Sequence, residues 1–373
     1  MSDEVLVDGS VTVYRLYDIG YTIALDHAAE LLGASMSGRS RPLRLEARAI
    51  EIRNPPLLAT LGAFDLMVAG SPRRASVSAH LFDFGVCSLQ VGIVAPPRLA
   101  WSAFTESCAA IESATDLGVV FDREVRDLAA RIGPAVERPA IATLAEEYKV
   151  YRVDRITCDR QSSAPIADVL TDEEIAELVI GERKRLSSAA LRELIPHRYS
   201  YYEDDLTVVT WESALVVEPR VDDRDVEYIL EFANAQLLEL RVYDQRLDAD
   251  LPALYDRAEA ARAGRSPRLA NRFRAVLSDL QTRVADITET VERVDNALKV
   301  TNDVYLARIY AGALDQFRAQ AWRRGIDRKL AILRETYAML NDEAQAARGE
   351  LLEIVIVLLI LVELILGLLR RAL

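Results

Sequence analysis

The residues that most often carry catalysis or bind metals are few and scattered in this chain of 373 residues. Its three histidines, His27, His80 and His197, lie far apart, and no HExxH motif surrounds any of them. A histidine without a neighbouring ligand or carboxylate in sequence is more often a core or surface residue than a metal ligand. The histidines therefore predict no metal site.

Short motifs of common enzyme sites are also missing. The sequence has no GxSxG turn for a nucleophilic serine, and neither a GxxxxGK[ST] nor a GxGxxG loop for phosphates. Cys87, Cys108 and Cys158 are widely spaced without a CxxC pair, which indicates reduced thiols and argues against a zinc ribbon. We therefore predict no catalytic residue, no cofactor and no enzymatic activity.

Two pairs of adjacent carboxylates are the remaining candidates for acid–base chemistry. Asp204–Asp205 and Asp222–Asp223 each stand at an expected turn or helix start. Carboxylates at such places accept hydrogen bonds from the free amides of the first helical turn. We interpret both pairs as structural.

The net charge of the chain limits the kinds of partner that it can bind. It is −13, with 58 acidic and 45 basic residues. Binding to nucleic acid needs a basic face that neutralises phosphates. The charge balance therefore argues against direct nucleic-acid binding.

Residues 1–220 have the alternation of strands and helices that is typical of an α+β domain. Strand-like stretches cover residues 11–16, 43–52, 148–156 and 206–217, and residues 75–94 alternate around Gly85 as two short strands or one bent strand. Residues 101–113 and 122–132 have helical patterns, and Thr171 with Glu174 predicts a capping box. We expect a mixed or antiparallel sheet with helices on one face.

Residues 221–350 have the pattern of long helices. A heptad seam with alternating steps of three and four predicts a coiled coil that would carry an oligomer contact. Its positions are Leu277, Leu280, Val284, Ile287, Val291, Val294 and Leu298. A further helix from about residue 326 continues to residue 351, so we expect antiparallel helices that form a stalk.

Residues 351–370 have the composition of a transmembrane helix. Residues 351–369 would extend roughly 28 Å as a helix, which matches the hydrocarbon layer of a bilayer. Glu363 inside the segment costs on the order of 3 kcal/mol, whereas its Leu, Ile and Val residues gain roughly 4–8 kcal/mol. The expected span includes Ile354, Leu358, Leu361, Glu363 and Leu366. The alternatives are a buried core or coiled-coil helix for the segment, and a polar pairing or a functional carboxylate ring for Glu363.

The expected location follows from the two ends of the chain. Residues 1–9 are acidic and have neither the apolar core of a signal peptide nor the arginines of a transit peptide. We therefore expect a tail-anchored, single-pass protein of the cell inner (cytoplasmic) membrane, with the bulk of the chain in the cytoplasm.

Several stretches of sequence resemble the required-for-meiotic-nuclear-division family, also called domain of unknown function 155. The motif residues are Glu231, Asn234, Gln236, Glu239 and Arg241, and they are accompanied by similar stretches at residues 82–86, 291–299, 303–308 and 352–353. The resemblance extends over residues 11–369. It implies a membrane-anchored protein that forms large homo-oligomers, is linked to translation and has no established enzymatic activity.

Together these expectations describe a membrane-anchored scaffold that oligomerises and binds a cytoplasmic partner. Its expected partners are membrane lipid, further copies of itself and an unidentified cytoplasmic protein. An alternative from another class is a subunit of a CorA-like oligomeric ion channel or transporter, which an α/β domain followed by long helices and a terminal apolar helix suggests by analogy alone.

Overall fold

The chain is a mixed α+β protein built around a large sheet. The computed structural model describes residues 5–33, 36–39, 50–52, 54–68, 70–114, 116–157, 166–220, 222–263, 298–300 and 304–372, with the single positions 278, 282, 285 and 288. It divides into two compact units. The first comprises residues 1–242 with 293–320, and the second comprises residues 243–292 with 321–373.

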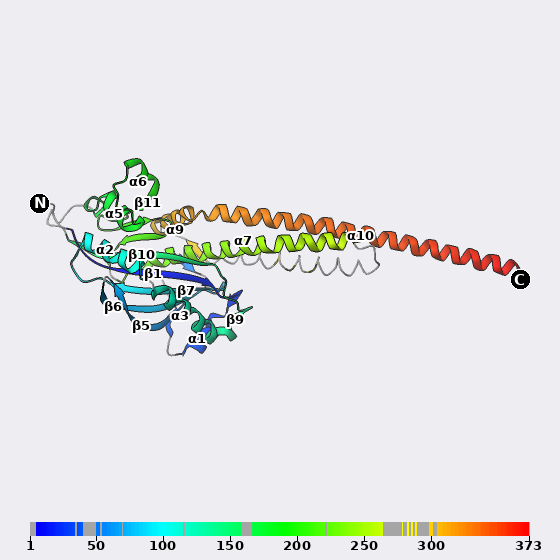
Figure 1. Cartoon of the computed structure of the whole chain (residues 1–373), viewed down its shortest axis with the longest axis horizontal. Coiled ribbons are helices and arrows are strands. Elements are labelled where there is room, and N and C mark those ends of the chain that lie inside the picture. The colour runs from blue at the N-terminus through cyan, green and yellow to red at the C-terminus, as the bar shows by residue number, and fades with distance from the viewer. Residues whose placement is uncertain are drawn as a thin grey trace. The chain divides into compact units, whose positions relative to one another are not determined.

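A sheet of ten described strands forms the first unit (Figure 1). Its strand order is β11 (His197–Tyr199), β12 (Leu206–Val209), β13 (Ser213–Val217), β10 (Ala145–Thr157), β1 (Leu6–Asp18), β7 (Val86–Val94), β6 (Ser71–Leu81), β5 (Leu57–Val68) and β3 (Met36–Arg39), while β8 (Leu99–Ala100) pairs with one end of β1. Neighbouring strands run antiparallel except β10 and β13, which are parallel. Two small ladders join β2 (Thr22–Ile23) to β9 (Val136–Glu137) and β4 (Ile50–Ile52) to β14 (Leu298–Val300).

The alternation of side chains gives the central strands two different faces. In β1, Val7, Val11 and Val13 belong to the apolar core, whereas Thr12 and Tyr14 line the opposite face. Side chains that are two residues apart in a strand share a face, so a strand with alternating Val and Ser or Thr separates apolar from polar groups. One face of the sheet is therefore the core, and the other carries hydroxyl groups.

Helices cover the apolar face. The main ones are α1 (Leu25–Leu32), α2 (Trp101–Glu112), α3 (Asp116–Ile132) and α5 (Asp172–Ile180), and their buried residues belong to the same core as the sheet. Shorter elements are α4 (Ile166–Val169), α6 (Ser188–Leu194) and the 3-10 turn η2 (Gly133–Ala135). The predicted capping box of α5 is confirmed, because Thr171 and Glu174 exchange side-chain and backbone hydrogen bonds.

The polar face is covered by α7 (Asp225–Ala263) up to Val242 and by α9 (Val304–Gln316). Phe232 of α7 makes edge contacts with Phe82 and Phe84 at the β6–β7 turn, with ring centroids 5.9 Å apart in both pairs. Phe317, just after α9, packs edge-on against Tyr148 of β10. The Phe232 contacts fix the start of α7 at the β6–β7 turn, and the Phe317 contact fixes the end of α9 against β10.

The described part of the second unit is helical and contains the rest of α7 and most of α10 (Ala319–Ala372). Lys329 Nζ joins the two helices, because it lies 2.7 Å from Asp244 Oδ1 and 2.6 Å from Asp248 Oδ1. No long coiled coil is evident in the described part of the chain. Six of the predicted seam positions lie outside the described residues, and Leu298 lies in β14, where the backbone pairs with β4.

The apolar segment near residue 360 is the last part of the 54-residue helix α10. Within the described ranges, no helix is both long enough and apolar enough to cross a bilayer. The predicted fold class is therefore wrong in its coiled-coil stalk and its membrane span, and the tail-anchored inner-membrane location derived from that span is wrong as well. Glu353 and Glu363 interrupt the apolar run, and Ile354, Leu358, Leu361 and Leu366 are 52–61% exposed in α10.

Candidate functional site

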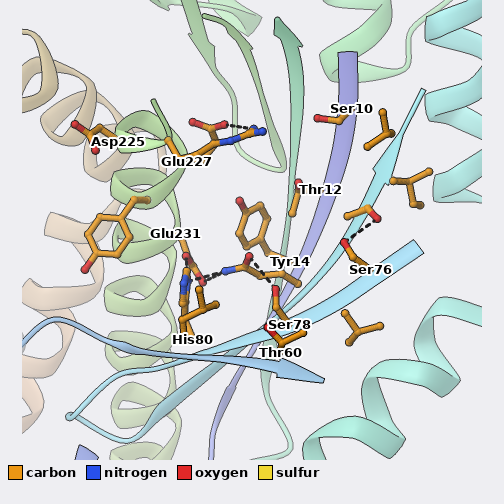
Figure 2. Close-up of a pocket in the computed structure, with 18 residues that line it drawn as sticks. Ser10, Thr12, Tyr14, Thr60, Ser76, Ser78, His80, Asp225, Glu227 and Glu231 are labelled. Atoms are coloured by element: carbon orange, nitrogen blue, oxygen red, sulfur yellow. Dashed lines mark hydrogen bonds and ion pairs between the residues drawn. The ribbon is translucent and has the colours of Figure 1, made fainter. Parts of the chain in front are cut away.

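A cavity of about 540 Å³ lies between the polar face of the sheet and the first two turns of α7 (Figure 2). Strands β1, β5, β6 and β7 form one wall, and residues 224–231 form the other. Cavities of this size hold small organic molecules. Most of the residues that line the cavity have polar side chains, and they come from segments that are far apart in sequence.

The sheet wall is an ordered array of hydroxyl groups. In the strand register Gly92 lies between Thr12 and Ser76, and Gln90 lies between Tyr14 and Ser78. Figure 2 shows Ser10, Thr12, Ser76 and Ser78 on one side of the cavity, with Thr60 beside Ser78. Gly92 leaves room between these side chains, because a Cβ atom there would lie 2.9 Å from Ser76 Oγ.

His80 and Glu231 connect the sheet wall to the helix wall. His80 Nδ1 lies 2.7 Å from Glu231 Oε2, and Gln90 Nε2 lies 2.8 Å from Glu231 Oε1. Gln90 Nε2 also lies 2.7 Å from His80 Nδ1. An amide nitrogen cannot accept, so the arrangement that satisfies the carboxylate has both His80 Nδ1–H and the Gln90 amide donating to Glu231.

Glu227 occupies the neighbouring position on the helix wall, one turn before Glu231. Arg152 Nη1 donates to Glu227 Oε1 at 2.8 Å, and Arg224 Nη1 donates to the same oxygen at 3.0 Å. The Arg152 side chain is only 1% exposed, and the Glu227 side chain is 8% exposed. Both cations therefore share one oxygen of this carboxylate.

Glu227 Oε2 and the Tyr228 hydroxyl are buried oxygen atoms of the helix wall without a hydrogen-bond partner among the described residues. Both residues line the cavity. Burial, with the nearby Glu231 and Asp225 carboxylates, raises the pKa of Tyr228, so its hydroxyl keeps its proton at physiological pH. Leaving a buried polar group without a partner costs about 1–3 kcal/mol. Both oxygens are buried inside the helix wall, so a water-sized group in the cavity does not reach them.

The other sequence candidates lie away from the cavity and have structural surroundings. His27 is exposed on α1, and His197 Nε2 of β11 lies 3.6 Å from Asp315. Cys87 and Cys108 are free and buried, and Cys158 lies outside the described residues. Burial raises the pKa of Cys87 to about 12, which makes it a poor nucleophile.

The two carboxylate pairs occupy turns. Asp205 accepts hydrogen bonds from the backbone amides of Tyr201 and Tyr202 at 2.7 and 3.2 Å. Asp223 accepts from the amide of Asp225, at the first turn of α7. Neither pair forms two facing carboxylates with a shared ligand.

Of the five motif residues on α7, only Glu231 lines the cavity. Asn234 donates to the Leu230 carbonyl at 2.8 Å, one turn earlier in the helix. Gln236 accepts a hydrogen bond from Tyr310 of α9, Arg241 is ion-paired with Glu146 of β10, and Glu239 is buried. These contacts attach α7 to α9 and to the sheet.

Comparison with known proteins assigns the part of the chain that forms the sheet to a protein family. The model of the family described as "Uncharacterized protein MJ0711, N-terminal domain" matches residues 8–224, which is more than half of the chain. The chain belongs to this family. The match includes every strand of the sheet and ends at Arg224, just before α7.

A relative with the same description supports this assignment. "Uncharacterized protein MJ0711" of Methanocaldococcus jannaschii is 23% identical over 224 residues, which cover 60% of this chain and 66% of the relative. The match thus spans slightly less than two thirds of the relative's length. No solved structure matches the chain. The resemblance to the required-for-meiotic-nuclear-division family is wrong, since the matching family is a different one, and its implied membrane anchor lacks support as well.

Reasoning from the sequence missed the cavity. His80 and Glu231 are 151 residues apart and share no local motif. The available signal was the alternation in β6, where Ser76, Ser78 and His80 share one face while the intervening positions are apolar. Three polar side chains on one face of a central strand indicate a polar site between that face and the element that covers it.

Proposed function

We propose that this protein is a binding module for a small polar molecule and that the cavity between the sheet and α7 is its site. The observation that carries this proposal is the cavity itself, in which serine and threonine hydroxyls of the sheet face the first two turns of α7. Hydrogen bonds within the two walls hold His80, Gln90 and Glu227 in place, so the cavity is formed before a ligand enters. Pre-organisation of this kind lowers the entropy cost of binding.

The polar groups are arranged for binding rather than for chemistry on a ligand. Glu231 receives hydrogen bonds from both His80 and Gln90, and Glu227 is ion-paired with two arginines. The thiol of Cys87 does not line the cavity, has a raised pKa and is fully buried. We therefore propose a non-enzymatic function for the site.

Calorimetric screening of the full chain against small polar molecules tests this function. A ligand raises the unfolding temperature because it binds only the folded state. Gly92→Val should abolish the rise, because a β-branched side chain suits a strand but fills the space beside Ser76. Ser71→Val, at the exposed start of β6 outside the cavity, should respond like the wild type.

Two results would refute the binding function. One is a screen in which no compound raises the unfolding temperature of the wild type. The other is a rise that Gly92→Val retains in full, because the compounds would then bind elsewhere. The cooperative transition of Gly92→Val in the same scan shows whether this variant folds.

A second function, an oligomeric scaffold, is supported by the end of α10. The apolar side chains of residues 352–366 are each between 42% and 63% exposed, on all sides of the helix. Covering them would gain on the order of 10 kcal/mol, because burying a Leu, Ile or Val side chain completely gains about 1.5–3 kcal/mol. A helix that is apolar all round needs cover on every side, and the same segment of further copies offers a matching apolar surface.

Light scattering of the purified full chain tests the scaffold. The double variant Leu358→Glu with Leu361→Glu should reduce an oligomer to monomers. The double variant Val119→Glu with Val304→Glu changes side chains that are 71% and 70% exposed elsewhere, so it should keep the wild-type mass. A monomeric wild type, or an unchanged mass in the first variant, would exclude this contact.

The channel alternative stays a prediction that nothing in the structure tests.

A further inference from the structure

The charges around the cavity largely cancel one another. Asp225, Glu227 and Glu231 line the helix wall, while Arg224 and the buried Arg152 lie against Glu227. Three carboxylates thus face two guanidinium groups and the His80 imidazole, which lies 2.7 Å from Glu231. The carboxylates would repel an anionic ligand, and the two arginines would repel a cationic ligand near Glu227. The charge pattern therefore favours an uncharged ligand.

The hydroxyl groups of the sheet wall offer hydrogen bonds to a molecule in the cavity. Each serine or threonine hydroxyl can both donate and accept. The Glu227 Oε2 atom and the Tyr228 hydroxyl are buried inside the helix wall and do not face the cavity. A ligand with several hydroxyl groups matches the sheet wall, because each of its hydroxyls can also donate or accept.

The shape of the cavity agrees with this chemistry. A volume of about 540 Å³ is far more than a single water molecule needs and suits a molecule of the size of a monosaccharide. Apolar groups of Leu58 and Val94 also line it. They can contact the C–H faces of a sugar ring while its hydroxyl groups face the polar side chains.

We propose that the ligand is a small uncharged polyhydroxy compound, a sugar or cyclitol, held between the hydroxyl array of the sheet and the first two turns of α7. This inference rests on the proposed binding function and adds the class of ligand. Thr12, Ser76 and Ser78 contact the ligand hydroxyls on the sheet side.

Three groups of probes separate this inference from the binding function itself. The full chain is heated with D-glucose, D-ribose or myo-inositol, with choline or spermidine, and with inorganic phosphate or citrate. At a probe concentration 100-fold above its dissociation constant, a polyol should raise the unfolding temperature by about 5–10 °C. Gly92→Val should lose this rise, and Ser71→Val should retain it.

The other possible results contradict the polyol class, and they differ in what they say about the binding function. If only amines or only anions raise the unfolding temperature, and Gly92→Val abolishes that rise, the cavity binds ligands but the polyol class is wrong. If no probe of any group has an effect, the polyol class is wrong, and the broader screen then decides whether the binding function also fails.

Hydroxyl deletions test the contacts directly. Ser78→Ala and Thr12→Ala should each weaken polyol binding about 5- to 10-fold, the value of roughly one hydrogen bond. Ser113→Ala removes a hydroxyl that donates to the Ala109 carbonyl on exposed α2, so its affinity should be unchanged. Equal affinities in all three variants would place the polyol outside the hydroxyl array and overturn the inference.

Discussion

Arg152 of β10 donates to Glu227 of α7 at 2.8 Å, and this ion pair fixes the helix wall of the cavity. The other donors of Arg152 bond the Asp154 carboxylate and the carbonyls of Glu218, Arg220 and Asp223. A guanidinium group has five N–H donors, and here each has an acceptor. A buried cation with complete hydrogen bonding is stable, but the loss of one partner leaves charged or polar groups uncompensated.

Arg152→Met should therefore lower the free energy of unfolding by about 3–5 kcal/mol, because it removes the buried donor of several carbonyls and leaves Glu227 with only the half-exposed Arg224. Chemical denaturation followed by circular dichroism measures this loss. The matched control is Arg123→Met, since Arg123 pairs with Glu124 on the exposed side of α3. An exposed pair of this kind contributes about 0–1 kcal/mol. Similar losses in both variants would show that Arg152 does not hold α7 in place.

Tyr228→Phe should raise the free energy of unfolding of the ligand-free protein by about 1 kcal/mol. The change removes a buried hydroxyl that has no partner among the described residues and keeps the ring that packs edge-on against His80. Tyr148→Phe is the control, because its hydroxyl donates to the Ser213 carbonyl at 2.8 Å and its loss should destabilise. Denaturation of both variants measures the two effects, and a destabilised Tyr228→Phe would mean that the hydroxyl is already satisfied.

Much of the first unit was predictable because its signals are local. Residues 75–94 alternate around Gly85, and the structure contains strands β6 and β7 on either side of it. The capping box at Thr171 uses residues three positions apart, so sequence alone identified it. Such features depend on neighbours within a few residues, and tertiary packing did not override them.

The cavity and the helical part depend on contacts between residues that are far apart in sequence. The sequence alone did not predict these contacts. Glu231 meets His80 only because the β6 register and the position of α7 bring them together. Leu298 fits a heptad, but pairing with β4 places it in a strand. The apolar run in α10 has the composition of a membrane segment, yet periodicity and hydropathy cannot say what surrounds a helix.

Cys87 and Cys108 should resist thiol reagents while the protein is folded. Both side chains are buried, and burial raises the pKa of both thiols, to about 12 for Cys87. The reactive thiolate is therefore scarce at neutral pH. In a Cys158→Ser background, absorbance with a disulfide reagent should show no reaction in buffer and two reactive thiols in denaturant. Rapid reaction of the folded variant would show that this core opens easily.

Gly85→Ala should destabilise the protein by more than 2 kcal/mol because two constraints act on the same residue. Its φ of +99° is a conformation that residues with a side chain avoid, and an added Cβ would lie 2.0 Å from the Gly20 carbonyl oxygen. Gly349→Ala is the matched control, since this helical glycine in α10 has open space around the position of a Cβ. Alanine is better than glycine inside a helix by about 1 kcal/mol, so the control should stabilise. Urea denaturation should thus give changes of opposite sign. If Gly85→Ala unfolded at the wild-type urea concentration, the β6–β7 turn would not need the conformation seen here.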